Sequence, residues 1–217
     1  METVTHNKRG NKTPKSLVIM LHGWGANGAD LISIADYWTE ILPDTLFIAP
    51  DAPDVCEQNP FGRQWFPLGD WLKDRDINYV VKGAKVAHPK LDTFIKNIGK
   101  EYNVPHEKIV LMGFSQGMMM SFYTGMRQET PLAGILGYSG GVCAVDEVQE
   151  AGYPKVPVCL IHGGADDVVP VALHHQSVSE LKKAGYPLDS LEVPGLQHGI
   201  DPGGIQKGAE FLIRVLG

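Results

Sequence analysis

The segment 113–117 (GFSQG) places a serine two residues away from a glycine on each side. It follows a predicted strand at 108–112 and precedes a helix that we predict to start near Gln116. On a sharp strand-to-helix turn, the flanking glycines avoid collisions with both elements and leave the Ser115 hydroxyl exposed, where the helix N-terminus favours a developing oxyanion. This arrangement predicts a nucleophilic serine. The alternative is that Ser115 only caps the helix within a tight glycine turn.

Two later loops contain the residue types that a nucleophilic serine needs. The hydroxyl requires a histidine to take its proton, and that histidine requires an acid to fix its tautomer. His198 follows the last predicted strand, and Asp166 and Asp167 follow the strand before it. The chain order serine, aspartate, histidine is the one found in α/β-hydrolases. We therefore predict that His198 is the base and that Asp166 or Asp167 is the acid; the alternatives are a backbone-bonded loop histidine and a helix N-cap.

A glycine-flanked tryptophan follows the first predicted strand, in His22-Gly-Trp-Gly25. In α/β-hydrolases this loop supplies one donor of the oxyanion hole, and the residue after the nucleophile supplies the other. We predict that the backbone N–H groups of Trp24 and Gln116 form this pair. The Trp24 side chain is interpreted as ordinary packing.

Short apolar runs alternate with helical stretches along the chain, a pattern typical of a mostly parallel sheet covered on both faces. We therefore assign the α/β class, in which functional side chains gather at the carboxyl ends of the strands. The predicted strands are 16–21, 45–49, 108–112, 132–137, 156–161 and 188–193. The predicted helices are 29–42, 79–102, one from about 116, 171–185 and 204–216, and 54–76 is predicted to be irregular.

The length of 217 residues, with 43% hydrophobic residues, favours a single domain over 1–217 with a polar N-terminal extension at 1–15. There are 19 basic and 25 acidic residues, a net charge of -6, and no basic patch, which argues against a nucleic-acid partner. The segment 1–16 lacks the apolar core of a signal peptide, and the apolar run 17–21 is too short for a membrane helix. We expect a cytoplasmic protein with no integral membrane segment.

The three cysteines have no CxxC spacing, so neither a disulfide framework nor a zinc site is indicated. We expect reduced thiols, with Cys159 in the core and Cys56 in a loop that could be exposed. His174 and His175 fall on a predicted helix and suit neither metal ligation nor the triad order, so we expect both at the surface.

The segment 59–71 is rich in aromatic and aliphatic residues although it is predicted to be irregular. An apolar loop of this kind could flank the catalytic serine and hold an acyl chain. We hypothesise that Trp65 and Leu68 line an acyl groove. The alternative is a loop fixed to the core by its aromatic side chains.

With these motifs, the chain from about 17 to 216 resembles the phospholipase/carboxylesterase family, which includes the acyl-protein thioesterases. The resemblance rests on HGWG, GFSQG, the element Arg63-Gln-Trp-Phe66 and the pattern H-G-x-x-D-x-x-V-P at 162–170. It implies a minimal α/β-hydrolase core without a cap domain and assigns the acid to Asp166. The chain departs from many members at Asp167, where proline is usual.

The resemblance also assigns the base to His198 and the oxyanion donors to Trp24 and Gln116. It implies hydrolysis of carboxylic esters, with acyl thioesters and lysophospholipids as candidate substrates, without a metal or an organic cofactor. Members of the family often pair as homodimers. The rival interpretations are a serine peptidase or lactonase on the same scaffold, and a binding protein with an inactive site.

Overall fold

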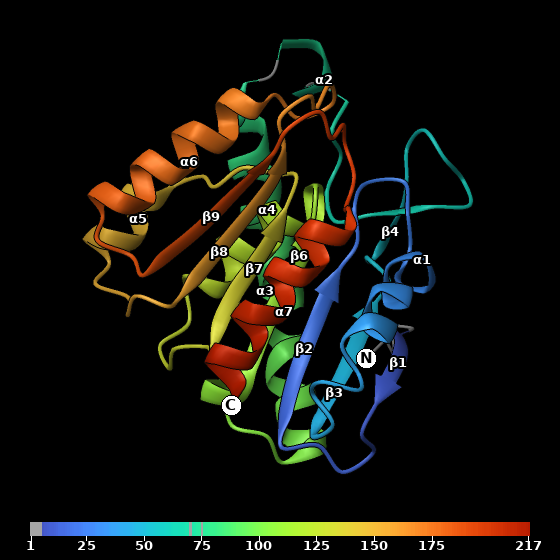
Figure 1. The fold of residues 1–217 in the computed structure, drawn as a ribbon. Helices are drawn as coiled ribbons and strands as arrows, with labels where there is room; N and C mark the ends of the chain where they lie inside the picture. Colours follow the sequence, from blue (N-terminus) through green and yellow to red (C-terminus); the bar gives the residue numbers. More distant parts are fainter. Residues whose placement is uncertain (1–5, 70, 75) are drawn as a thin grey trace.

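Seven strands form one sheet in the order β1-β3-β2-β6-β7-β8-β9 (Figure 1). The computed structural model describes residues 6–69, 71–74 and 76–217. Within these residues, β1 pairs antiparallel with β3 and all other neighbours in this sheet are parallel. The strands are β1 (His6–Gly10), β2 (Ser16–Leu21), β3 (Thr45–Pro50), β6 (Ile109–Phe114), β7 (Gly134–Tyr138), β8 (Val158–Gly163) and β9 (Leu188–Val193).

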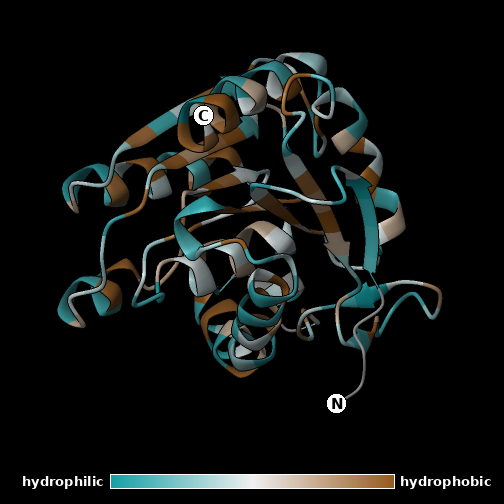
Figure 2. Cartoon of the chain, turned by 90° about the horizontal axis from the view of Figure 1, so that it is seen from below, coloured by the Kyte–Doolittle hydropathy of each residue, from teal (hydrophilic) through white to brown (hydrophobic). Residues whose placement is uncertain are grey.

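The strands divide their side chains between two helical layers. In β2, Leu17, Ile19 and Leu21 face one layer and Val18 and Met20 face the other, because neighbouring side chains of a strand point to opposite faces. Every residue of β2 is buried, which explains its continuous apolar sequence. Figure 2 shows the same distribution, with the central strands largely brown and the outer loops largely teal or white.

The helices α3, α4, α5 and α6 cover one face of the sheet, and α1 and α7 cover the other. A small pair of strands lies in the segment before α2. The helices are α1 (Gly28–Ile32), α2 (Trp71–Asp74), α3 (Ile77–Tyr102), α4 (Gln116–Gly125), α5 (Val145–Glu150), α6 (Val171–Lys183) and α7 (Pro202–Leu216), with 3-10 turns η1 (Ser33–Tyr37) and η2 (His106–Lys108). The small strands are β4 (Asp54–Val55) and β5 (Arg63–Gln64).

The α/β class is confirmed, while four local predictions differ from the structure. The predicted extension 1–15 contains the edge strand β1, whose polar sequence suits an edge that pairs on one side only. The predicted helix 29–42 is only α1 followed by η1, and the irregular segment 54–76 contains β4, β5 and α2. The helix α5 was not predicted; it starts after Ala144, which has a φ of 58° and makes no side-chain cap. Residues 1–5 of the predicted extension lie outside the described residues.

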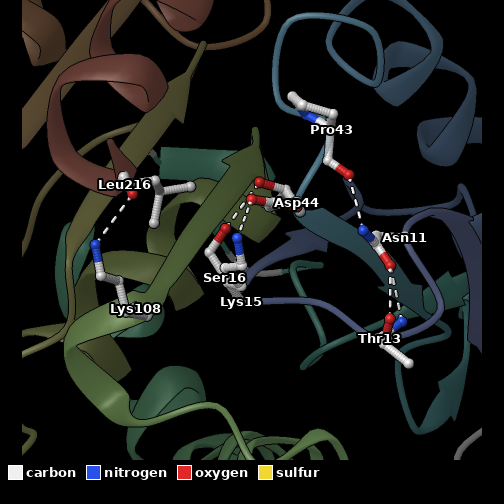
Figure 3. Close-up of polar contacts among 9 residues, drawn as sticks. Asn11, Thr13, Lys15, Ser16, Pro43, Asp44, Lys108 and Leu216 are labelled. Carbon is white, nitrogen blue, oxygen red and sulfur yellow. Dashed lines mark hydrogen bonds and ion pairs between the residues drawn. The ribbon is translucent and has the colours of Figure 1, made fainter.

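Polar contacts join the amino ends of the strands. The Lys15 ammonium lies 2.7 Å from an Asp44 carboxylate oxygen, and the Asn11 amide donates to the carbonyl of Pro43 (Figure 3). Nearby, the Lys108 ammonium donates to the Leu216 carbonyl at the end of α7 (Figure 3). These contacts lie before β2, β3 and β6, at the end of the sheet opposite the loops described below.

All three cysteines are free and buried. Burial of Cys159 is confirmed, whereas the expectation that Cys56 could be exposed is wrong because its side chain packs beside the loop after β2. Burial raises the pKa of the Cys143 and Cys159 thiols to about 12, so both remain protonated near neutral pH. Among the described residues, no helix is both long and apolar enough to cross a bilayer.

Candidate active site

Ser115 lies on a strained turn between β6 and α4. Its φ is 54° and its ψ is -117°, a backbone conformation that a residue with a side chain seldom adopts. A Cβ at Gly117 would lie 1.9 Å from the Leu21 carbonyl oxygen, and one at Gly113 would lie 2.3 Å from the Gly117 carbonyl oxygen. Only glycine fits at these two positions. The helix-cap alternative is wrong, because the Ser115 side chain makes no cap hydrogen bond.

His198 and Asp166 meet across the loops that follow β9 and β8. Nδ1 of His198 lies 2.8 Å from Oδ2 of Asp166, and the carboxylate is buried while the imidazole is partly exposed. The other carboxylate oxygen, Oδ1, accepts the backbone N–H groups of Val168 and Val169 at 3.0 and 2.8 Å. Asp167, the alternate acid, is exposed. The structure therefore brings Asp166 to His198 and leaves Asp167 in solvent.

The serine turn and the histidine loop lie at the same edge of the sheet. Phe114, which precedes Ser115, places its ring 4.9 Å from the ring of His198. The Ser139 hydroxyl, after β7, donates to the carbonyl of Gly199 and holds the histidine loop from the other side. Among the described residues, no hydrogen bond joins Ser115 to His198. Such bonds often tighten only in the enzyme–substrate complex.

The loop after β2 lies directly against the serine turn. A Cβ at Gly23 would lie 3.4 Å from Cβ of Ser115, so the next amide, that of Trp24, is close to the serine. Within the described part of the chain, this Trp24 N–H makes no hydrogen bond. Gln116 is the first residue of α4, where a backbone N–H has no acceptor inside the helix. Both predicted oxyanion donors are therefore available to a ligand, and the Trp24 side chain donates to Gln64 and packs against the core.

The Gln116 side chain has contacts that the sequence analysis did not anticipate. It is fully buried, its Oε1 accepts the backbone N–H of Trp65 at 3.0 Å, and its Nε2 donates to the Phe66 carbonyl at 2.7 Å. The Trp65 indole N–H in turn donates to the carbonyl of His22. One side chain therefore ties the nucleophile turn to the apolar segment 59–71. The only sequence signal for this role was the glutamine inside the serine motif.

Trp65 and Leu68 are both buried in the core cluster that contains β2 and α3. The Leu68 N–H donates to Glu57, so this part of the loop is fixed to the core, as the alternative interpretation expects. A cavity of about 250 Å³ lies at this loop, but neither Trp65 nor Leu68 lines it. It is lined by Glu57, Pro67, Gly69, Trp71, Tyr79 and Gly83. The groove role of Trp65 and Leu68 stays a prediction.

His174 is buried, contrary to the expectation that both helix histidines are at the surface; His175 is exposed. The His174 ring packs 5.3 Å from the ring of His162 at the end of β8, which removes it from water. Burial lowers the pKa of His174 from its ordinary value of 6.5 to about 4. The signal that could have identified it is the spacing of three and seven residues from His174 to Ser177 and Leu181, which places these three buried residues on one face of α6.

The buried His174 predicts a loss of stability in mild acid. Between about pH 4 and 6.5, His174 binds a proton in the unfolded chain but not in the folded chain. This difference leaves the free energy of unfolding unchanged above pH 6.5 and lowers it progressively as the pH falls from 6.5 towards 4. We expect His174→Leu to remove on the order of 2 kcal/mol of the acid-induced decline. Urea unfolding at pH 7 and at pH 4.5 measures this decline in the free energy of unfolding for each protein. His175→Gln is the control, and equal declines in wild type and His174→Leu would contradict the prediction.

The comparisons with known proteins show the family and the fold of the chain. The sequence profile of the phospholipase/carboxylesterase family matches residues 4–216. Acyl-protein thioesterase 1 from Emericella nidulans is 30% identical over 94% of this chain and 92% of its own. The crystal structure of esterase PE8 is 38% identical, with a TM-score of 0.92 over 98% of this chain and 99% of its own. The Bacillus cereus carboxylesterase, 18% identical with a TM-score of 0.77 over 99% and 95% of the two chains, shares the fold.

The seven-stranded sheet with helices on both faces matches these esterase structures, and no cap domain is evident in the described residues. The family match covers nearly the whole chain. The chain therefore belongs to the phospholipase/carboxylesterase family of α/β-hydrolases, and it is a carboxylic ester hydrolase.

Proposed function

We propose that this protein is a serine esterase in which Ser115, His198 and Asp166 form a catalytic triad. The observation that carries the proposal is the 2.8 Å contact between His198 Nδ1 and the buried Asp166 carboxylate, at the sheet edge where Ser115 has its strained turn. A carboxylate accepts only, so Nδ1 of His198 carries the proton and Nε2 keeps its lone pair. Nε2 is then the atom that takes the Ser115 proton.

The reaction follows from these assignments. Ser115 Oγ forms a bond to the acyl carbon as His198 takes its proton, and the carbonyl electron pair moves onto oxygen. The backbone N–H groups of Trp24 and Gln116 stabilise that oxyanion. The bond to the alkoxide or thiolate then breaks, and His198 protonates this leaving group. A water molecule hydrolyses the acyl-enzyme by the same steps and releases the carboxylic acid.

The substrate class that we propose is a linear acyl ester or thioester. Relatives named acyl-protein thioesterase support this choice, as does the apolar segment 59–71 tied to the nucleophile turn by Gln116. Within that segment, Trp65 and Leu68 would line the acyl groove. The cytoplasmic location and the homodimer that the sequence resemblance implies stay predictions.

Matched oxygen esters and thioesters with acyl chains from short to long test the proposal. We expect turnover that falls sharply with chain lengths outside one preferred range, and a shift of that range in Leu68→Ala. A preference for short oxygen esters identifies a general carboxylesterase, and a preference for long thioesters identifies a deacylase of acylated thiols. Absence of turnover by folded protein at every length would contradict the proposal and favour a peptidase, a lactonase or an inactive binding protein.

A further inference from the structure

His162 lies directly behind the proposed triad acid. It lies near the end of β8, four residues before Asp166, and both side chains are fully shielded from solvent. Its Nε2 lies 2.9 Å from the Val169 carbonyl oxygen and 3.4 Å from Oδ2 of Asp166. The neutral imidazole has one N–H, and both neighbours of Nε2 can only accept, so the proton is on Nε2. Among the described residues, the buried Nδ1 has no hydrogen-bond partner, as expected for the unprotonated nitrogen.

This N–H completes a closed set of contacts around the carboxylate. The Val169 amide donates to Oδ1 of Asp166, and the Val169 carbonyl accepts from His162. The His162 N–H also faces Oδ2, the oxygen that accepts from His198. The turn that orients the carboxylate is thus held on one side by its own backbone and on the other by the imidazole of His162.

The surroundings of His162 favour its neutral form. Burial lowers its pKa below the ordinary value, and it is therefore uncharged near neutral pH. A proton on Nδ1 would place a positive charge beside Asp166, in competition with His198 for the same carboxylate. The titratable groups around His162 are Asp166 on its own loop, His174 and His175 on α6, Glu192 on β9 and His198 on the loop after β9.

We propose that His162 is a positioning residue for Asp166, a role that rests on the triad proposed above. Its neutral Nε2–H holds the Val169 carbonyl and faces Oδ2, so that the carboxylate keeps the orientation that His198 needs. His162 touches no substrate and acts only through Asp166. A merely structural role would change the stability of the protein and leave the pH dependence of catalysis unchanged.

Two variants separate these roles. His162→Leu removes the N–H while keeping an apolar side chain in the core, and His162→Gln can return an amide N–H to the position of Nε2. Without the N–H, the carboxylate loses the polar group that lies 3.4 Å from Oδ2, and it stabilises a protonated His198 more strongly. For His162→Leu we expect the lower inflection of the kcat/KM profile to move up by about half a pH unit or more. We expect kcat to fall about tenfold with KM unchanged, and His162→Gln to recover most of both effects.

A pH profile of His162→Leu identical to that of wild type would overturn the proposal, as would a His162→Gln variant no better than a folded His162→Leu. If His162→Leu does not fold, nitrogen NMR of the wild-type imidazoles decides. We expect a protonated Nε2 and an unprotonated Nδ1 for His162 at neutral pH, and the opposite tautomer would overturn the proposal. Hydrolysis by wild-type protein that does not depend on Ser115 would instead contradict the proposed triad itself.

Discussion

We expect Ser115→Ala to abolish ester hydrolysis and to leave the fold intact. In the proposed mechanism the Ser115 hydroxyl forms the acyl-enzyme, so kcat should fall by about 10⁵-fold or more. The Ser115 hydroxyl makes no hydrogen bond to the helix, and alanine meets the same backbone strain at a φ of 54° as serine does. The unfolding midpoint should therefore remain close to that of wild type. Steady-state kinetics with the preferred ester, together with thermal unfolding, measure both quantities.

The matched control for this variant is Ser179→Ala, an exposed serine on α6. It loses a hydroxyl of the same kind far from the nucleophile turn and should keep full activity. Substantial turnover by Ser115→Ala would contradict a serine mechanism. A large drop in the unfolding midpoint of Ser115→Ala would show that the side chain has a structural role that its contacts do not reveal.

Asp166→Asn should reduce kcat by about 10⁴-fold, because it changes which nitrogen of the His198 imidazole carries the proton. The asparagine oxygen must replace Oδ1, because two backbone N–H groups, those of Val168 and Val169, point at that site. The amide NH₂ then replaces Oδ2 and faces Nδ1 of His198 with a donor. Nδ1 must become an acceptor, so the proton moves to Nε2. In this tautomer His198 cannot take the proton of Ser115.

Asp167→Asn is the control that distinguishes the two neighbouring acids. Asp167 is exposed, so neutralising it should change kcat by no more than about twofold at moderate ionic strength. The measurement is kcat for both variants on one substrate, with circular dichroism to verify folding. Loss of activity in Asp167→Asn with retention in Asp166→Asn would reverse the assignment and require a rearranged loop after β8.

The main features of the site were predictable because they are local in the sequence. The serine turn is defined by glycines at 113 and 117, whose missing side chains make room for the carbonyls of Leu21 and Gly117. The loop after β8 follows a fully buried strand that begins with four apolar residues, and the loop after β9 follows a half-buried strand that mixes apolar and polar residues. A parallel sheet then brings these loops to one edge. The resemblance to a family narrowed the acid to Asp166, which local patterns alone left open.

The features that were not predicted depend on contacts between distant parts of the chain. The Gln116 side chain bonds to the backbone of Trp65 and Phe66, about fifty residues earlier in the sequence. His174 packs against the ring of His162 from β8, on the same face of α6 as the buried Ser177 and Leu181. The edge strand β1 is polar and gains its structure by pairing with β3. Each of these features is determined by tertiary packing.

The most direct test of the proposed mechanism is to label the protein with a fluorophosphonate and map the modified peptide by mass spectrometry. This reagent requires an activated serine, so it reports the nucleophile together with its base. We predict one adduct, on Ser115, formed by wild type and absent from Ser115→Ala. Labelling at another residue, or no labelling of folded active enzyme, would contradict the assignment of Ser115 as the nucleophile.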